Sequence, residues 1–96
     1  MPQVASVGRF VHVYNPKLWL GARPGMIVTG PMGPVETQRA NVNVALDGVT
    51  DADVLAHFRA RPEGNTFALI PVRDQLDEAQ RADANWECWA EFPPRV

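Results

Sequence analysis

The chain of 96 residues holds few side chains that could do chemistry, and their spacing does not favour catalysis. It has two histidines, His12 and His57, and a single cysteine, Cys88. A metal site needs three or four converging ligands, and neither histidine belongs to a paired motif such as H-x-H or H-x-x-x-H. Ser6 is the one serine, so a serine–histidine–acid triad has little to start from. We therefore expect no catalytic residues, no metal ion and no cofactor, and predict that the protein is not an enzyme.

Two groups of acidic residues suit turns and solvation better than catalysis. Asp47, Asp51 and Asp53 have the spacing of part of a calcium-binding loop, but the further oxygen ligands and the terminal Glu are missing at the required offsets. Glu87 and Glu91 share one face of a predicted strand, where they flank a tryptophan. This arrangement is typical of a solvated face rather than of a general acid and base.

Composition and charge restrict the class of partner. The net charge is −2 at pH 7, whereas a general binder of nucleic-acid backbones usually carries a basic surplus. A single thiol cannot form an intrachain disulfide, which suits a reducing compartment. The first residues do not resemble a signal peptide, and no apolar run approaches the roughly 20 residues that span a bilayer. We expect a cytoplasmic protein with no membrane partner, and the charge balance disfavours nucleic acid as its partner.

The elements that must position any site are short strands. Apolar residues alternate with polar ones, or form short runs that glycine and proline end, at about residues 8–14, 25–29, 40–46, 66–72 and 85–92. The third segment has the clearest pattern, because Val42, Val44 and Leu46 alternate with small or polar residues and Asp47-Gly48 supplies turn chemistry. Five strands of this length predict a sheet that closes or rolls up around a single core.

One short α-helix is predicted at about residues 51–60. Thr50–Asp53 is close to a capping box, and the apolar positions that follow lead to Phe58. We expect this helix to cover an open side of the sheet. Residues 73–84 are polar and acidic with Leu76 as their one large apolar residue, so they predict a mobile excursion with one helical turn. Together these segments predict a single, mainly β domain, a small five-stranded SH3-like barrel or roll, with residues 1–7 as an N-terminal arm.

Aromatic side chains are the candidates for binding. Alternation along the last strand places Trp86, Cys88, Ala90 and Phe92 on the core face and leaves Trp89 at least partly exposed. Cys88 is thereby predicted to be a buried structural thiol rather than a nucleophile.

The predicted binding residues are Tyr14, Trp19, Arg23 and Trp89. Trp19 lies in Leu18–Leu20, an apolar loop segment that either folds back over the end of the barrel or forms an exposed contact patch. Exposed aromatic residues anchor protein partners and stack on nucleobases alike. For a nucleotide or nucleic acid, the candidate phosphate partners are Arg9, Arg23, Arg39 and Arg95.

The order of four motifs resembles a group of small, uncharacterised proteins of tailed bacteriophages and prophages. Those chains share the patterns G-R-x-V-H-Y, R-P-A-I-V, N-L-x-V-x-x-D-G and W-H-W-P-x-R. The counterparts here are GRFVHVY at 8–14, RPGMIV at 23–28, NVNVALDG at 41–48 and EFPPR at 91–95. The resemblance implies a phage-borne accessory protein with a small SH3-like barrel, and it supplies no catalytic residues.

These observations favour a non-enzymatic protein-interaction module. Its expected partner is a host or phage protein, or a second copy of the chain in a homo-oligomer, in the cytoplasm of an infected bacterium. Two alternatives stay open. One is a barrel that binds a ligand or nucleic acid, such as an anti-defence protein that sequesters a nucleotide. The other is a minor component of the virion.

Overall fold

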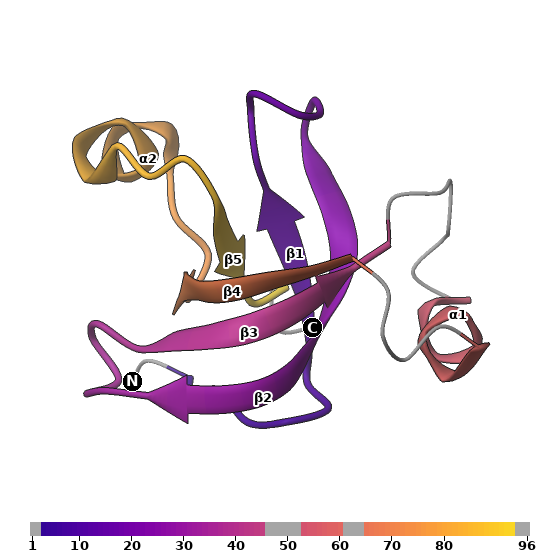
Figure 1. Ribbon diagram of the computed structural model, residues 1–96. Coiled ribbons are helices and arrows are strands. Elements are labelled where there is room, and N and C mark those ends of the chain that lie inside the picture. The colour runs from indigo at the N-terminus through magenta and orange to yellow at the C-terminus, as the bar shows by residue number, and fades with distance from the viewer. Residues whose placement is uncertain (1–2, 46–52, 61–64, 94–96) are drawn as a thin grey trace.

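The five strands form a closed barrel in sequential order (Figure 1). The computed structural model describes residues 3–45, 53–60 and 65–93. The strands are β1 (Phe10–Tyr14), β2 (Ala22–Met32), β3 (Arg39–Val44), β4 (Asn65–Arg73) and β5 (Trp89–Glu91). The helices are α1 (Val54–Ala60) and α2 (Glu78–Ala84). The barrel closes because β1 pairs antiparallel with both β2 and β5. The predicted mainly β fold, a small five-stranded SH3-like barrel, is confirmed.

One hydrophobic core fills the barrel. Val42 and Val44 are completely buried in it, so the inward face predicted from the alternation in β3 is confirmed. Gly25 on β2 lets three strands approach closely, since a Cβ atom there would lie 2.7 Å from a side-chain carbon of Val13 on β1 and 3.0 Å from one of Val42. A larger residue at position 25 would displace these valines.

Strand β2 is longer than predicted. It continues past Thr29 to Met32, through the Gly30-Pro31 sequence, whereas the predicted strand ends at about residue 29. Its pairing with β3 shifts register between Ile27 and Thr29 and again between Thr29 and Met32. These irregularities are what allow a strand to accommodate a proline and a glycine.

Helix α2 connects β4 to β5, which run parallel through the pairs Val72–Ala90 and Arg73–Glu91. Parallel neighbours need a crossover of a dozen or more residues, and residues 74–88 supply it. The predicted single helical turn in residues 73–84 is too short, because α2 spans seven residues and begins at a capping box formed by Asp77 and Gln80. The Asp77 carboxylate accepts from the Gln80 N–H at 2.8 Å, and the Gln80 side chain accepts from the Asp77 N–H at 3.0 Å.

The last strand is shorter than predicted. Asn85 ends α2 in the left-handed conformation, with φ 52° and ψ 39°, and its N–H donates to the Arg81 carbonyl. The chain therefore turns at Asn85 instead of starting a strand there. Residues 86–88 link the helix to β5, which begins at Trp89.

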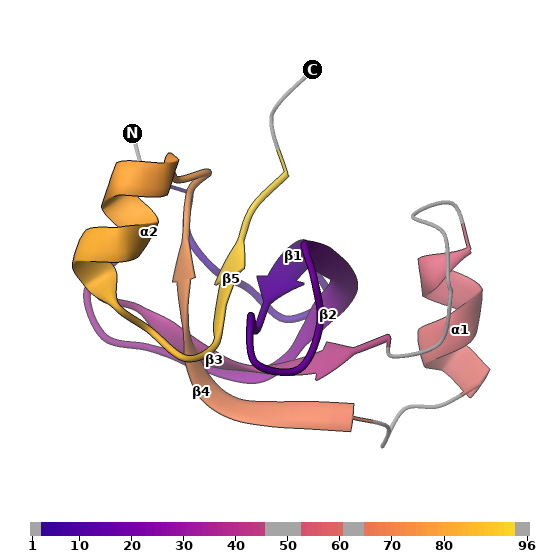
Figure 2. The same ribbon diagram turned by 90° about the horizontal axis from the view of Figure 1, so that it is seen from above.

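Helix α1 lies on the opposite side of the barrel from α2 (Figures 1 and 2). Its Phe58 is buried with Ala45, and Phe10 and Met26 pack beside them in a cluster separate from the main core. The predicted helix is thus confirmed as Val54–Ala60, while the proposed cap at Thr50 lies outside the described residues.

Within the described ranges, none of the helices is long and apolar enough to cross a membrane.

Candidate functional site

Strand β5 buries the tryptophan that we expected on the surface. Trp89 is 5% exposed, its ring stacks on Tyr14 with centroids 5.4 Å apart, and Trp86 lies against it at 6.3 Å. The prediction that Trp89 is exposed is wrong, because the crossover that contains α2 covers the outer face of β5. Alternation alone assigned that face to solvent.

Glu91 lies on the same covered face and attaches α2 to the barrel. The residue is 1% exposed, and its carboxylate accepts from Nε and Nη2 of Arg81, at 2.8 and 2.9 Å. The Trp89 indole N–H donates to it at 2.8 Å and the Leu76 backbone N–H at 3.1 Å. Hydrogen bonding to Glu91 raises the pKa of the Arg81 guanidinium. Because α2 buries none of its own residues, this bidentate ion pair is a principal contact between the helix and the barrel.

Tyr14, a predicted binding residue, belongs to the same cluster. The Arg81 guanidinium lies 4.5 Å from the centre of its ring, and Nη2 of Arg81 lies 3.3 Å from its hydroxyl oxygen. Burial and the nearby Glu91 carboxylate raise the pKa of Tyr14. The ring is half-buried and is held by intramolecular contacts to Arg81 and Trp89. Its contribution is to packing around Glu91 rather than to a separate aromatic platform.

Trp19 and Arg23, the other two predicted binding residues, meet at a different place. Trp19 is buried and donates its indole N–H to the Val13 carbonyl at 3.1 Å, and its ring contacts Phe67 edge-on. The Arg23 guanidinium lies 5.5 Å from the centre of the Trp19 ring. Trp19 therefore folds back over the barrel, which was one of the two alternatives predicted for its loop.

The leucines on either side of Trp19 are exposed, which is the other alternative predicted for this loop. Leu18 is 66% exposed and Leu20 is 97% exposed, between β1 and β2. The backbone at Leu18 and Trp19 is hydrogen-bonded, because the buried Asn15 accepts at its carbonyl from the N–H groups of both residues, at 2.9 and 3.0 Å. We call Leu18 and Leu20 the leucine loop. Its two apolar side chains are held outward by a buried tryptophan between them.

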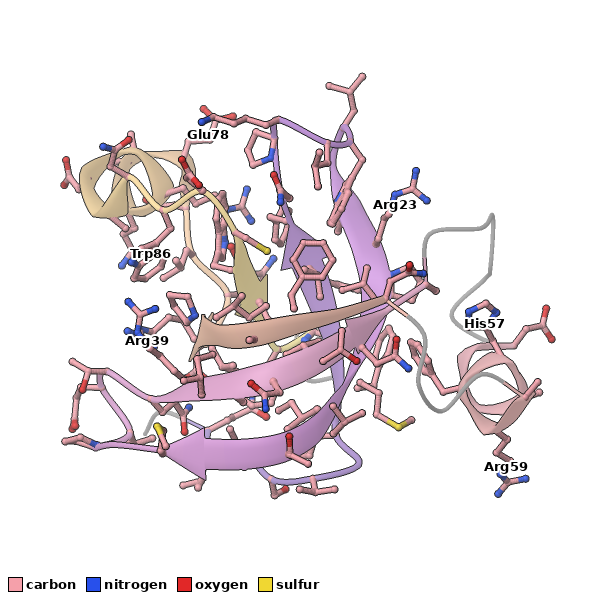
Figure 3. The ribbon with its side chains drawn as sticks, viewed as in Figure 1. Arg23, Arg39, His57, Arg59, Glu78 and Trp86 are labelled. Carbon is pink, nitrogen blue, oxygen red and sulfur yellow. The ribbon has the colours of Figure 1, made fainter. Side chains whose placement is uncertain are left out.

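The four predicted binding residues thus do not form one site, but another group does come together. Arg39 at the start of β3 lies opposite Pro71 of β4, which makes Arg73 its diagonal neighbour on the outer face of the barrel. The Arg73 guanidinium lies 5.0 Å from the centre of the Trp86 ring. We call Arg39, Arg73 and Trp86 the arginine–tryptophan corner. Arg39 and Trp86 lie on the side of the barrel that carries α2, away from Arg23 (Figure 3).

Sequence reasoning missed most of this corner. It named Arg39 but not Arg73, and it assigned Trp86 to the core face of the last strand. That assignment is wrong, because Trp86 lies in the link between Asn85 and β5 and is only half-buried. No periodic signal connects Arg73 with Trp86, so only the pairing of β3 with β4 and the path of the crossover bring them together.

The remaining candidate residues lie elsewhere. Arg9 stacks on Phe92 at 4.3 Å and donates to the Gln3 side chain at 2.6 Å, so it fixes the N-terminal arm. Arg95 lies outside the described residues. Cys88 is half-buried, and burial raises the pKa of its thiol to about 11, which disfavours a nucleophilic thiolate. In the described part of the chain, no three His, Cys, Asp or Glu side chains group together to hold a metal ion.

Comparison of the chain with protein-family models, with curated proteins and with solved structures finds no match. Its function must therefore be argued from its own surfaces.

Proposed function

We propose that the chain is a non-enzymatic protein-interaction module that binds its partner through the leucine loop. The observation that supports this is the exposure of Leu18 and Leu20 on a loop whose backbone is hydrogen-bonded to Asn15. Following the resemblance to phage proteins, the proposed partner is a host or phage protein in the cytoplasm of an infected bacterium. A second copy of the chain is the other partner to be tested.

The proposal relocates the contact from the aromatic residues to the leucines. Trp19 and Trp89 are buried, so they stabilise the barrel that presents the loop and do not touch a partner. Burial of a leucine side chain contributes about 1.5–3 kcal/mol, and a few such residues carry most of the energy of an interface. A partner with an apolar pocket would therefore gain most of its affinity from Leu18 and Leu20.

The test is the double variant Leu18→Ser/Leu20→Ser. At about 1.5 kcal/mol for each leucine, the affinity for the partner should fall about 100-fold. Partners are captured from lysate of infected cells by chemical cross-linking and identified by mass spectrometry. Affinity is then measured with the purified partner, and light scattering reports self-association. The melting temperature should stay unchanged, since both side chains are exposed in the free protein.

The matched control is Val4→Ser/Val7→Ser, which removes two apolar side chains that are 66% and 64% exposed elsewhere on the molecule. It should leave affinity unchanged. Capture that survives Leu18→Ser/Leu20→Ser, or that is lost equally in the control, would contradict the proposal. Recovery of the chain from purified virus particles would instead support the role of a minor virion component.

A small anionic ligand is the second candidate for what the barrel binds. The observation that favours it is the arginine–tryptophan corner, where Arg39 and Arg73 are neighbours beside a half-buried indole. This surface is separate from the leucine loop, so the two candidates can be tested independently.

A further inference from the structure

The arginine–tryptophan corner gathers two guanidinium groups for which the described residues provide no ion-pair partner. The ion pairs of the described residues join Lys17 to Glu87 and Arg81 to Glu91, and neither Arg39 nor Arg73 takes part in one. Asp74, the acidic residue next to Arg73, accepts instead from the Gln3 backbone N–H at 2.9 Å. Two neighbouring guanidinium groups repel each other, and a bound anion would offset that repulsion.

Both guanidinium groups are held in place by the backbone. Nη1 of Arg73 donates to the carbonyls of Gln38 and Val72, at 2.7 and 2.9 Å, so it reaches back to the residue that precedes Arg39. Nη1 of Arg39 donates to the Leu69 carbonyl at 3.1 Å. An arginine has five N–H donors, so each side chain keeps donors for a ligand. Burial and the nearby Arg39 lower the pKa of Arg73, as expected for two cations close together.

The backbone beside Arg39 is strained. Leu69 has φ 50°, which a residue with a branched side chain rarely adopts, and its N–H donates to the Asn41 side chain at 2.8 Å. The pairing of β3 with β4 shifts register at this point. Strain of this kind persists where the surrounding structure imposes it, and it often accompanies binding sites. Here the strained backbone places the Leu69 carbonyl where it accepts the hydrogen bond that fixes Arg39.

The third member of the corner, Trp86, also borders an open hollow of about 450 Å³ whose other lining residues are Pro16, Lys17, Asn85 and Glu87. Sites for small molecules commonly have volumes of about 300–1,000 Å³. Trp86 therefore contacts the fixed Arg73 guanidinium and also borders a space large enough for a planar organic group.

We propose that Arg39, Arg73 and Trp86 bind the phosphate monoester of a small, nucleotide-like molecule. A phosphate monoester carries up to two negative charges at neutral pH, which matches the two arginines, and guanidinium groups bind it with charge-assisted hydrogen bonds. The organic part of the ligand packs on Trp86 at the hollow. This inference does not depend on the leucine loop and assigns the barrel a second binding surface.

The test uses the complete chain and three probes: inorganic phosphate, adenosine monophosphate and adenosine. Binding is followed by nuclear magnetic resonance of the Trp86 indole N–H and the arginine side chains. We expect adenosine monophosphate to bind about tenfold more tightly than phosphate, because base stacking adds roughly 1–3 kcal/mol, and adenosine to bind more weakly than either. Added sodium chloride should weaken the binding of both phosphate and adenosine monophosphate.

Arg39→Gln should lower the affinity for adenosine monophosphate at least tenfold. Trp86→Leu should make adenosine monophosphate bind no more tightly than phosphate. The matched control is Arg59→Gln on α1, an exposed arginine on the opposite side of the barrel (Figure 3). Arg39→Gln keeps the barrel testable, because Arg39 is exposed and makes a single side-chain hydrogen bond with the described residues.

Four results would overturn the proposal. They are no binding of phosphate or adenosine monophosphate at millimolar concentration, equal binding of adenosine and its monophosphate, an unchanged affinity in Arg39→Gln, or the same loss in Arg59→Gln. A single-stranded oligonucleotide that binds far more tightly than the mononucleotide would also overturn it and identify a nucleic-acid surface instead. None of these results bears on partner binding by the leucine loop.

Discussion

Replacement of Glu91 by glutamine should destabilise the barrel strongly, although it exchanges only one polar atom. The carboxylate accepts four hydrogen bonds, two from Arg81 and one each from Trp89 and Leu76. Glutamine keeps the size of the side chain but turns one acceptor into an NH₂ group. That group must face N–H donors, so at least one buried donor loses its partner and the Arg81 charge loses its counter-ion.

The size of the effect follows from burial. Loss of one partner of a buried ion pair costs about 3–5 kcal/mol. The Arg81 side chain is 28% exposed, so water compensates part of its charge and the lower value of about 3 kcal/mol applies. At about 4–8 °C for each kcal/mol in a domain of this size, the melting temperature should fall by about 12–24 °C.

The assay is urea unfolding at equilibrium, with Glu87→Gln as the matched control. Glu87 makes the same kind of contact, to Lys17 at 3.1 Å, but these side chains are 79% and 75% exposed. An exposed pair contributes about 0–1 kcal/mol, so the control should remain close to the original protein. A decrease in the free energy of unfolding of Glu91→Gln that is below about 1 kcal/mol, or equal to the decrease in Glu87→Gln, would refute the reasoning. The reasoning would also be refuted if hydrogen exchange showed that α2 is released while the free energy of unfolding of the barrel is unchanged.

Two further perturbations probe the core and the thiol. Gly25→Ala should cost about 1–3 kcal/mol in urea unfolding, because the new methyl group overlaps side chains of Val13 and Val42, and Val13→Ala should restore part of that loss. Cys88, whose pKa burial raises to about 11, should react slowly with iodoacetamide at pH 8 in the folded protein. Since the unfolded thiol ionises at lower pH, stability relative to Cys88→Ala should be full below about pH 8.5 and decrease as the pH rises toward 11. A folded-state alkylation rate equal to that of a free thiol, or a pH-independent difference, would contradict this.

The barrel could be predicted from sequence because its core depends on local alternation. Val42 and Val44 point inward as a period of two requires, and five short strands in a chain of this length predict a sheet that closes or rolls up around one core. The same alternation failed at β5, because period two separates two faces without showing whether both are covered. Trp89 and Glu91 lie on a face that only the crossover covers.

The candidate site was less accessible to sequence reasoning for a related reason. A glutamate inside a strand is assigned to solvent unless its cation is known, and Arg81 lies on a helix whose capping box at Asp77 was not recognised. The arginine–tryptophan corner depends on the register of β3 against β4 and on a left-handed residue, Asn85, after α2. Neither feature has a periodic signature in the chain.

The ion pair between Arg81 and Glu91 is connected to the arginine–tryptophan corner through the backbone of α2. Glu91 fixes the Arg81 side chain, the Arg81 carbonyl accepts from the Asn85 N–H at 3.2 Å, and Trp86 is the next residue. Release of Arg81 should therefore free the indole that borders the hollow. The leucine loop has no such connection, since it is fixed by Asn15 and by the buried ring of Trp19.

Glu91→Gln should accordingly lower the affinity for adenosine monophosphate about as much as Trp86→Leu does. Partner binding by the leucine loop should stay unchanged. Both affinities are measured at a temperature where near-ultraviolet circular dichroism shows the variant to be folded. Because the ligand would not touch Glu91, an effect on ligand affinity reports the position of Trp86 rather than a lost contact. If the folded variant binds the nucleotide with its original affinity, then α2 does not position the indole, and the buried ion pair serves stability alone.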